Sequence, residues 1–181
     1  KDDAKVRAVV EDSLSLVDAK GDAAVRSLAN KFDGYCPKNV QLSSSEIAAA
    51  IQKVSDRDME DIKFAQDQIR HFAQLQLRTI TDIEVETLPG VILGHKNIPV
   101  QSVGCYVPGG KFPLVAAAHM SVLTASVAGV PRIAASTPPS DGGPHPAIVA
   151  AMHLGGAHEI YMLGGIQAVA GAKGENKVLP C

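Results

Sequence analysis

Aromatic side chains are scarce in this sequence, and tryptophan is absent. Only 4% of the 181 residues are aromatic, although 46% are hydrophobic. The core must therefore be built from alanine, valine, leucine and isoleucine. That composition is typical of α/β layers, in which buried strands are rich in aliphatic residues and small side chains let helices lie close to a sheet.

Strong charge and long apolar runs are also missing. The formal net charge is −2, and no cluster of lysine and arginine provides a surface for nucleic acid or anionic lipid. No apolar run approaches the ~20 residues of a membrane span, and no signal peptide is recognised at the start. We therefore expect neither a nucleic-acid partner nor a membrane partner.

Cysteine is too sparse for a disulfide framework. The three cysteines, Cys36, Cys105 and Cys181, are far apart and odd in number. This pattern favours a reducing compartment and predicts a cytoplasmic protein. Without a C-x-x-C pair, a structural zinc site is not expected.

The first part of the chain, residues 1–81, has the periodicity of helices. Apolar residues recur at helical spacing, Gly21 is placed as a cap, and an S-x-x-D pattern starts at Ser55. We predict a helical arm for assembly, without chemistry of its own, with helices over 5–19, 23–32, from Ser45 to 54, and from Ser55 to about Leu77.

The remaining residues alternate between strand and helix patterns. Residues 82–105 predict a hairpin that turns at Pro89-Gly90, followed by a connecting strand. Residues 106–172 predict a Rossmann-like half domain, and 173–181 form a tail. The fold class is thus α/β: a partial Rossmann-like parallel sheet of about three strands with an N-terminal helical arm and a β-hairpin. In the half domain the expected helices are 113–129, 146–155 and 166–172, and the expected strands are 132–137 and 159–163.

Three loops follow the carboxyl ends of the predicted parallel strands, where ligands bind in such sheets. They cover residues 106–112, 137–145 and 164–167. Two Gly-Gly turns would let the backbone approach a ligand, and each precedes a helix whose first N–H groups are free. The G-x-G-x-x-G spacing is absent, so a purely steric need for glycine stays open. The glycines concerned are Gly109, Gly110, Gly164 and Gly165.

Tyr106 and Gln167 are the candidate binding residues, because each adjoins one Gly-Gly turn. Their ring and amide could converge on one pocket; the alternative is a buried aromatic and an ordinary helix-start residue. Cys105 precedes Tyr106, and alternation along a strand places at most one of the two on the ligand side.

Charged groups at the rim of these loops are Lys111, Asp141 and His145. Catalytic residues are not identified; Tyr106 and Lys111 are the candidates. A solvated loop explains the three rim groups equally well.

The histidines do not predict a metal site. His145, His153 and His158 are spaced eight and five residues apart, which does not put two on one helical face. His119 lies in an apolar helix and fits a hydrogen-bonded core histidine.

The segments "IPVQSVGCYVPGGKFPLVAAAHMSVLTASVAGVPRIAASTPP" and "HPAIVAAMHLGGAHEIYMLGGIQAVA" strongly resemble the histidinol dehydrogenase family, and are nearest its sulfopropanediol dehydrogenase-like branch. The resemblance implies that Tyr106 of Y-V-P-G-G and Gln167 of G-G-x-Q-A contact NAD. It also implies oxidation of an alcohol to an acid in two hydride transfers, assisted by zinc and a Glu-His pair.

Several family parts have no counterpart in this sequence. The zinc-ligand segments, the Glu-His pair and the G-P-G-N motif are missing, and the dipeptide His158-Glu159 matches an ordinary strand. The ending "GENKVLPC" is similar to a G-T-N-H-x-L-P-T segment that lies far downstream in the family. We therefore expect a shortened paralogue joined by an internal deletion.

Three functions follow from this comparison of motifs. The favoured one is a repurposed non-redox cyclase or isomerase that preorganises a small molecule in the former NAD and substrate pocket; it requires no cofactor, although NAD is possible. The second is a fragment or split subunit of an NAD-dependent alcohol dehydrogenase. The third is a non-catalytic binding or assembly module. Because loss of half of a sheet exposes an edge, a homodimer or larger homo-oligomer is predicted.

Overall fold

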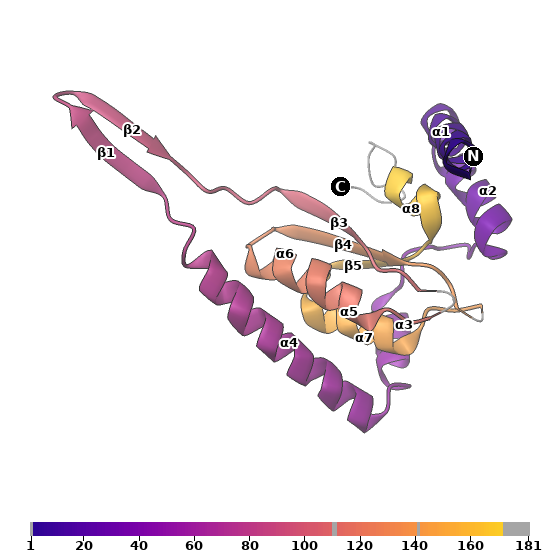
Figure 1. Ribbon diagram of the computed structural model, residues 1–181. Coiled ribbons are helices and arrows are strands. Elements are labelled where there is room, and N and C mark those ends of the chain that lie inside the picture. The colour runs from indigo at the N-terminus through magenta and orange to yellow at the C-terminus, as the bar shows by residue number, and fades with distance from the viewer. Residues whose placement is uncertain (1, 110–111, 141, 172–181) are drawn as a thin grey trace.

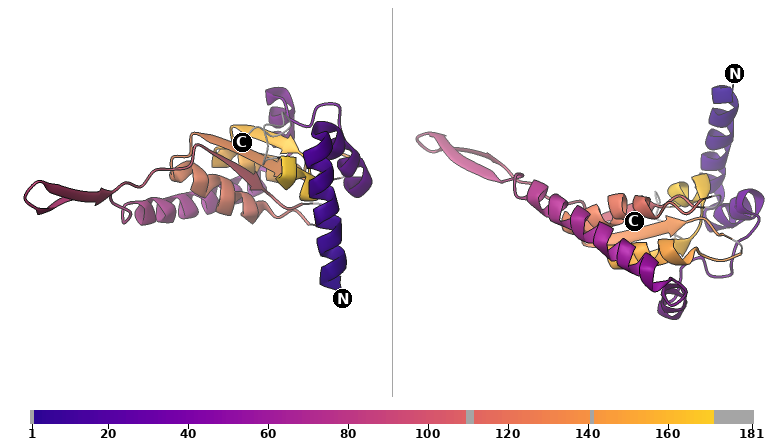
Figure 2. Two further views of the ribbon diagram at one scale, coloured as in Figure 1. Left: turned by 90° about the horizontal axis from the view of Figure 1, so that it is seen from above. Right: turned by 60° about the horizontal axis from the view of Figure 1, so that its bottom comes forward.

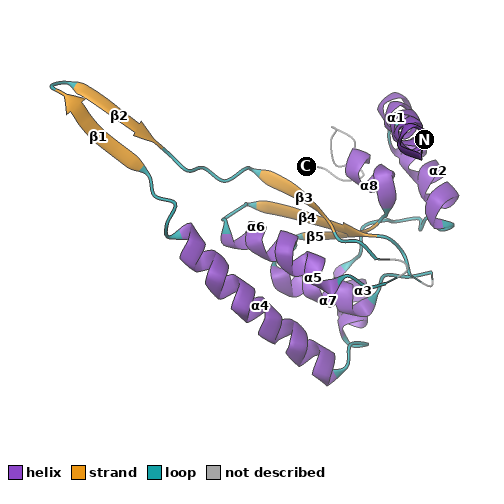
Figure 3. Cartoon of the chain, in the orientation of Figure 1, coloured by secondary structure: helices purple, strands orange, loops and turns teal. Residues whose placement is uncertain are grey.

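A three-stranded parallel sheet lies at the centre of the fold, as predicted (Figures 1 and 3). The computed structural model describes residues 2–109, 112–140 and 142–171. The strands follow one another in the order β3-β4-β5, and both pairings are parallel. They are β3 (Ser102–Tyr106), β4 (Arg132–Thr137) and β5 (Glu159–Met162).

One face of the sheet is covered by the crossover helices and by part of the N-terminal region. The helical segment formed by α5, η1 and α6 connects β3 to β4, and α7 connects β4 to β5. Helices α3 and α4 pack against these connecting helices (Figure 1). The buried core on this face contains Cys105, Ile133 and Ile160. The helices are α3 (Ser44–Ile51), α4 (Asp56–Leu77), α5 (Val115–Ala118), the π-helical turn η1 (His119–Leu123), α6 (Thr124–Val127) and α7 (Pro146–Gly155).

The other face is covered by α1 (Asp2–Lys20), α2 (Asp22–Asp33) and α8 (Gly165–Gly171). Its core contains Ala134 and Tyr161, with Tyr106 packed at its margin. Neighbouring strand residues point to opposite faces, so Cys105 and Tyr106 lie on different sides of the sheet, as the alternation predicted. Within the described ranges, no helix combines the length and the apolar character that crossing a bilayer needs.

Several helix starts differ from the prediction by one to three residues: α1 begins at Asp2 and not at residue 5, and the helix expected from residue 113 begins at Val115. Helix α3 begins after Ser43, not at Ser45, because the Ser43 hydroxyl accepts a hydrogen bond from the Glu46 N–H while Glu46 accepts one from the Ser43 N–H. The Glu46 carboxylate also accepts a hydrogen bond from the Ser43 hydroxyl, and this bond together with the one from the Ser43 N–H lowers the pKa of Glu46. The predicted start of α4 after Ser55 and its end at Leu77 are confirmed.

The hairpin is a separate two-stranded sheet that projects away from the rest of the chain (Figures 1 and 2). Strands β1 (Ile83–Leu88) and β2 (Val91–His95) pair antiparallel around Pro89-Gly90, where Gly90 has a φ of 81°. All residues of both strands are exposed, including large apolar ones such as Leu88 and Ile92. A hairpin alone is marginally stable in water, so this arm is suited to contact another surface.

The two edges of the central sheet differ. Residues 40–42 run along β5: the Leu42 N–H donates to the Ile160 carbonyl at 2.9 Å, and the Met162 N–H donates to the Val40 carbonyl at 2.7 Å. No pattern in the sequence indicated this addition. In the described part of the chain no strand pairs with the outer edge of β3.

A buried polar contact holds α4 on the crossover helices. The Gln66 carboxamide donates to the Ala151 carbonyl at 2.9 Å and lies 3.2 Å from Nδ1 of His119. Only 5% of His119 is exposed, and burial lowers its pKa. Because the Gln66 NH₂ group can only donate, Nδ1 of His119 accepts this hydrogen bond. The expectation that His119 is a hydrogen-bonded core histidine is confirmed.

Replacing Gln66 by methionine tests this contact. The Gln66→Met protein keeps the side-chain volume but leaves two buried acceptors without a donor, so the free energy of unfolding should fall by about 2 kcal/mol. The matched control is Gln68→Met, at an exposed position of the same helix. Equal urea midpoints for the two variants would contradict the role of Gln66.

Candidate functional site

The loops that follow the three parallel strands meet in close contact at the carboxyl end of the sheet. A Cβ on Gly164 would lie 2.6 Å from Cβ of Pro138, and one on Gly109 would lie 3.2 Å from Oγ1 of Thr137. Both distances are shorter than ordinary contacts. Loop packing therefore requires the absence of a side chain at Gly164, whether or not a ligand also approaches it, while a side chain at Gly109 would need its neighbours to shift by a few tenths of an ångström.

Tyr106 is the last residue of β3 and joins this strand to the turn between β5 and α8. Its hydroxyl accepts a hydrogen bond from the Gly165 N–H at 3.2 Å, and its ring is partly buried on the α8 face. Gly165 has a φ of 63°, a conformation that favours glycine. The structure thus brings Tyr106 and the second Gly-Gly turn together, and the Gly165 N–H is already occupied by the phenol.

Gln167 lies beneath the same turn. Its side chain is fully buried, and Nε2 donates to Oδ2 of Asp33 at 2.9 Å. Its Oε1 is buried and has no partner among the described residues. In this structure Gln167 therefore supports the Gly164-Gly165 turn, and its contact with NAD stays a prediction.

Asp33 is a site residue that the sequence did not reveal. It is the last residue of α2, within the arm that we expected to lack chemistry, and it also accepts a hydrogen bond from the Gly164 backbone. Burial raises its pKa, and the bonds from Gln167 and Gly164 oppose that rise. The one available signal was its position, because a carboxylate is unfavourable at a helix C-terminus unless something else holds it.

Thr137 supplies a second buried polar atom near these loops. It ends β4, is not exposed, and its Oγ1 has no hydrogen-bond partner in the described part of the chain. The hydroxyl lies beside Gly109, on the sheet face opposite α8. Buried polar atoms are rarely left unpaired, so Thr137 and Gln167 mark places where a polar group from elsewhere fits.

The rim residues of the sequence prediction separate in space or cannot be placed. Gly110, Lys111 and Asp141 lie outside the described residues, as do Cys181 and the predicted tail 173–181. His145 precedes α7 and lines a pocket of about 590 Å³ on the α3 side of the sheet, together with Tyr35, Glu46, Lys53, Ser140 and Met162. Tyr106 and Gln167 do not line this pocket.

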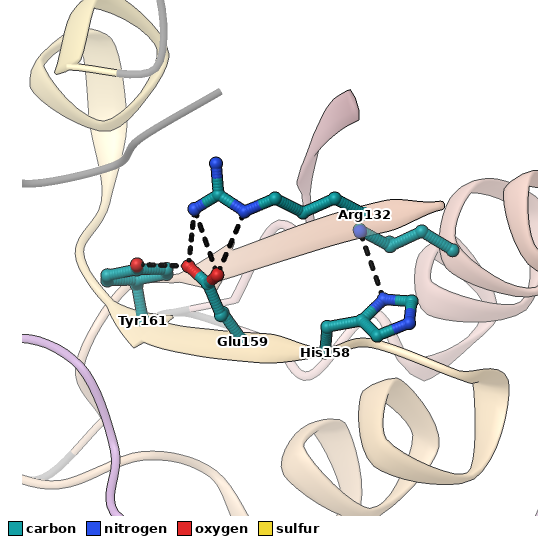
Figure 4. A network of polar contacts seen from close by, with 5 residues as sticks. Arg132, His158, Glu159 and Tyr161 are labelled. Atoms are coloured by element: carbon teal, nitrogen blue, oxygen red, sulfur yellow. Dashed lines mark hydrogen bonds and ion pairs between the residues drawn. The ribbon is translucent and has the colours of Figure 1, made fainter. Parts of the chain in front are cut away.

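His158 and Glu159 have structural partners. Nδ1 of His158 accepts a hydrogen bond from the Ile133 N–H at 3.0 Å, while His153 is exposed. Figure 4 shows the Glu159 carboxylate held by both the Arg132 guanidinium and the Tyr161 hydroxyl. Arg132 and Glu159 begin their strands, so this network lies at the amino end of the sheet, away from the candidate site.

The described residues do not fit a zinc ion. Among them, no group of three or more histidine, cysteine, aspartate or glutamate side chains is arranged to hold a metal. One partly buried tyrosine, closely packed glycine turns and two buried oxygens without a partner among the described residues adjoin the carboxyl ends of the strands. Ligands bind at this end of the strands in doubly wound sheets.

Residues 1–180 match the family model described as histidinol dehydrogenase, and the chain belongs to that family. It is 53% identical to a histidinol dehydrogenase homolog of Shouchella clausii over 91% of this chain and 39% of the relative. It is 48% identical to sulfopropanediol 3-dehydrogenase of Ruegeria pomeroyi, over 91% and 37%. For histidinol dehydrogenase of Methanosarcina mazei, the identity is 38% over 86% and 36%.

A solved structure shows the same fold. The crystal structure of histidinol dehydrogenase from Elizabethkingia anophelis superposes with a TM-score of 0.83 at 33% identity, over 92% of this chain and 38% of that one. The family resemblance and the fold class are thus confirmed. The chain spans about two fifths of the length of these relatives.

The comparisons bear unequally on the predicted functions. The relatives are named dehydrogenases, so an enzyme of oxidoreductase type fits at the level of the family. The cyclase or isomerase activity that we favoured from the sequence receives no support from any of these relatives.

A substitution at Gly164 tests the loop packing. In Gly164→Ala the new methyl group overlaps Pro138, so the free energy of unfolding should fall by about 1–3 kcal/mol. Gly143→Ala is the control, since a Cβ there meets no atom within 4 Å and φ is not positive. Chemical denaturation measures both. If Gly164→Ala were as stable as Gly143→Ala, the three loops would not be packed as described.

Proposed function

We propose that this chain forms the NAD-binding side of an NAD-dependent alcohol dehydrogenase. The observation that carries the proposal is the contact of the Tyr106 hydroxyl with the Gly165 N–H, at the point where the chain changes sides of the sheet. NAD supplies the hydride acceptor when it is bound. The residues of this chain bind and orient it.

The direction of the crossovers supports this position for the ligand. The helices between β3, β4 and β5 all lie on one face, whereas α8 crosses to the other face and contacts β3. In doubly wound sheets, ligands bind at the carboxyl ends of the strands where the winding reverses. Tyr106 ends β3 at the edge with which no strand of the described residues pairs, and this is where the rule places a dinucleotide.

The chemistry of the turn also suits a nucleotide. The partly buried ring of Tyr106 offers a flat surface for a base or a nicotinamide. The glycines at positions 109 and 164 bring loop backbone close to the same region. The remaining groups for proton transfer and metal binding are proposed to belong to the part of the relatives' length that this chain does not cover.

For the substrate, we propose a small alcohol other than histidinol. Identity to the relative named sulfopropanediol 3-dehydrogenase is 48%, against 38% for the histidinol dehydrogenase of Methanosarcina mazei. A homo-oligomer, supported by the exposed apolar side chains of the hairpin arm, and a cytoplasmic location are further proposals. A cyclase or isomerase and a non-catalytic module stay predictions.

Calorimetric titration with NAD tests the proposed function. The chain should bind NAD saturably, and Tyr106→Ala should weaken binding by about tenfold, since it removes both the aromatic surface and the contact to the turn. Tyr35→Ala is the matched control, because Tyr35 lines the separate pocket beside α3. The proposal fails if the wild-type chain shows no saturable binding, or if Tyr35→Ala loses as much affinity as Tyr106→Ala.

A further inference from the structure

The link between α2 and the β5–α8 turn is made by a side chain that can only accept hydrogen bonds. The ionised carboxylate of Asp33 receives Nε2 of Gln167 at 2.9 Å and the N–H of Gly164. Its Oδ1 lies 3.1 Å from the place that a Cβ on Gly164 would occupy. Asp33 thus holds two groups on opposite sides of the turn at once.

This pairing determines which atom Gln167 turns away from α2. A carboxamide has one donor side and one acceptor side, and a carboxylate neighbour requires the donor side. Oε1 is then the atom left to accept from another donor; it lies 2.9 Å from the position of a Cβ on Gly165, and Nε2 lies 3.3 Å from the same point. Oε1 is the buried Gln167 atom that has no partner among the described residues.

We infer that Asp33 is a positioning residue for the nucleotide site: it fixes the Gln167 amide so that an acceptor oxygen is presented behind the Gly164-Gly165 turn. This inference rests on the proposed NAD site and identifies Asp33 as a residue that holds part of that site in place. The group it receives is a hydrogen-bond donor of the bound dinucleotide, such as a hydroxyl or an amide N–H. Helix α2 thereby takes part in ligand binding without contacting the ligand.

A second contact, from the Tyr106 hydroxyl, connects the Gly164-Gly165 turn to β3. Gly164 and Gln167 are held by Asp33 from α2, while Gly165 between them is held by the Tyr106 hydroxyl from β3. A change in the amide of Gln167 would therefore act on the same short turn that Tyr106 contacts. Loss of the Asp33 carboxylate should therefore change the affinity for NAD.

The test compares Asp33→Asn with Asp18→Asn, which makes the same change at an exposed position of the neighbouring helix. An asparagine at position 33 can donate as well as accept a hydrogen bond, so the Gln167 amide can flip and exchange the places of Nε2 and Oε1. NAD affinity should then fall by about tenfold, the equivalent of one hydrogen bond. The free energy of unfolding should not fall, because the substitution removes a carboxylate whose charged form is disfavoured by burial. The side-chain NH₂ signals of Gln167 in the ¹⁵N spectrum should also move.

The outcomes separate the inference from the function on which it rests. If wild-type protein binds no NAD, both are wrong. If wild type binds NAD and Asp33→Asn binds it equally well, the inference alone is overturned. It is also overturned if affinity and stability fall in parallel while the Gln167 signals stay in place, since that result describes a purely structural contact. Asp18→Asn should leave affinity and signals unchanged.

Discussion

The rest of the site depends on the tight packing of the turn between β5 and α8. There the chain leaves the face that carries α5–α7 and crosses to the opposite face, and it does so against Pro138 in a space that admits no side chain at Gly164. The crossing places α8 over β3, and no strand of the described residues pairs with the outer edge of β3. Because the chain changes faces at this point, the proposed dinucleotide site lies at the carboxyl end of β3, where Tyr106 is the last residue.

Two side chains from distant parts of the sequence hold this turn. Tyr106 contacts Gly165 from β3, and Asp33 contacts Gly164 and Gln167 from α2. The N-terminal helices therefore contribute to the candidate site, since α2 ends in a partly buried carboxylate that holds the turn. Burial raises the pKa of Asp33, and the hydrogen bonds from Gln167 and Gly164 oppose that rise.

Patterns local to the sequence predicted most of the fold. Apolar spacing and the S-x-x-D start placed α4 from Ser55 to Leu77, and the change to alternating residues placed the hairpin around Pro89-Gly90. What could not be predicted depends on contacts between distant segments. The cover of β5 by residues 40–42 involves backbone groups that any residue carries, and the Asp33–Gln167 bond joins positions 134 residues apart. Tyr106 and Gln167 were identified from their motifs, but only packing shows that Gln167 is fully buried.

The central claim is that a dinucleotide binds at the β3 end of the sheet and not in the pocket beside α3. It is tested most directly by titrating ¹⁵N-labelled protein with NAD and mapping the backbone amide shifts. The account predicts that the largest changes fall on Tyr106, Gly109 and the Gly164–Gln167 turn, with a smaller change at Asp33. Changes centred instead on Glu46, Lys53 and His145 would contradict it.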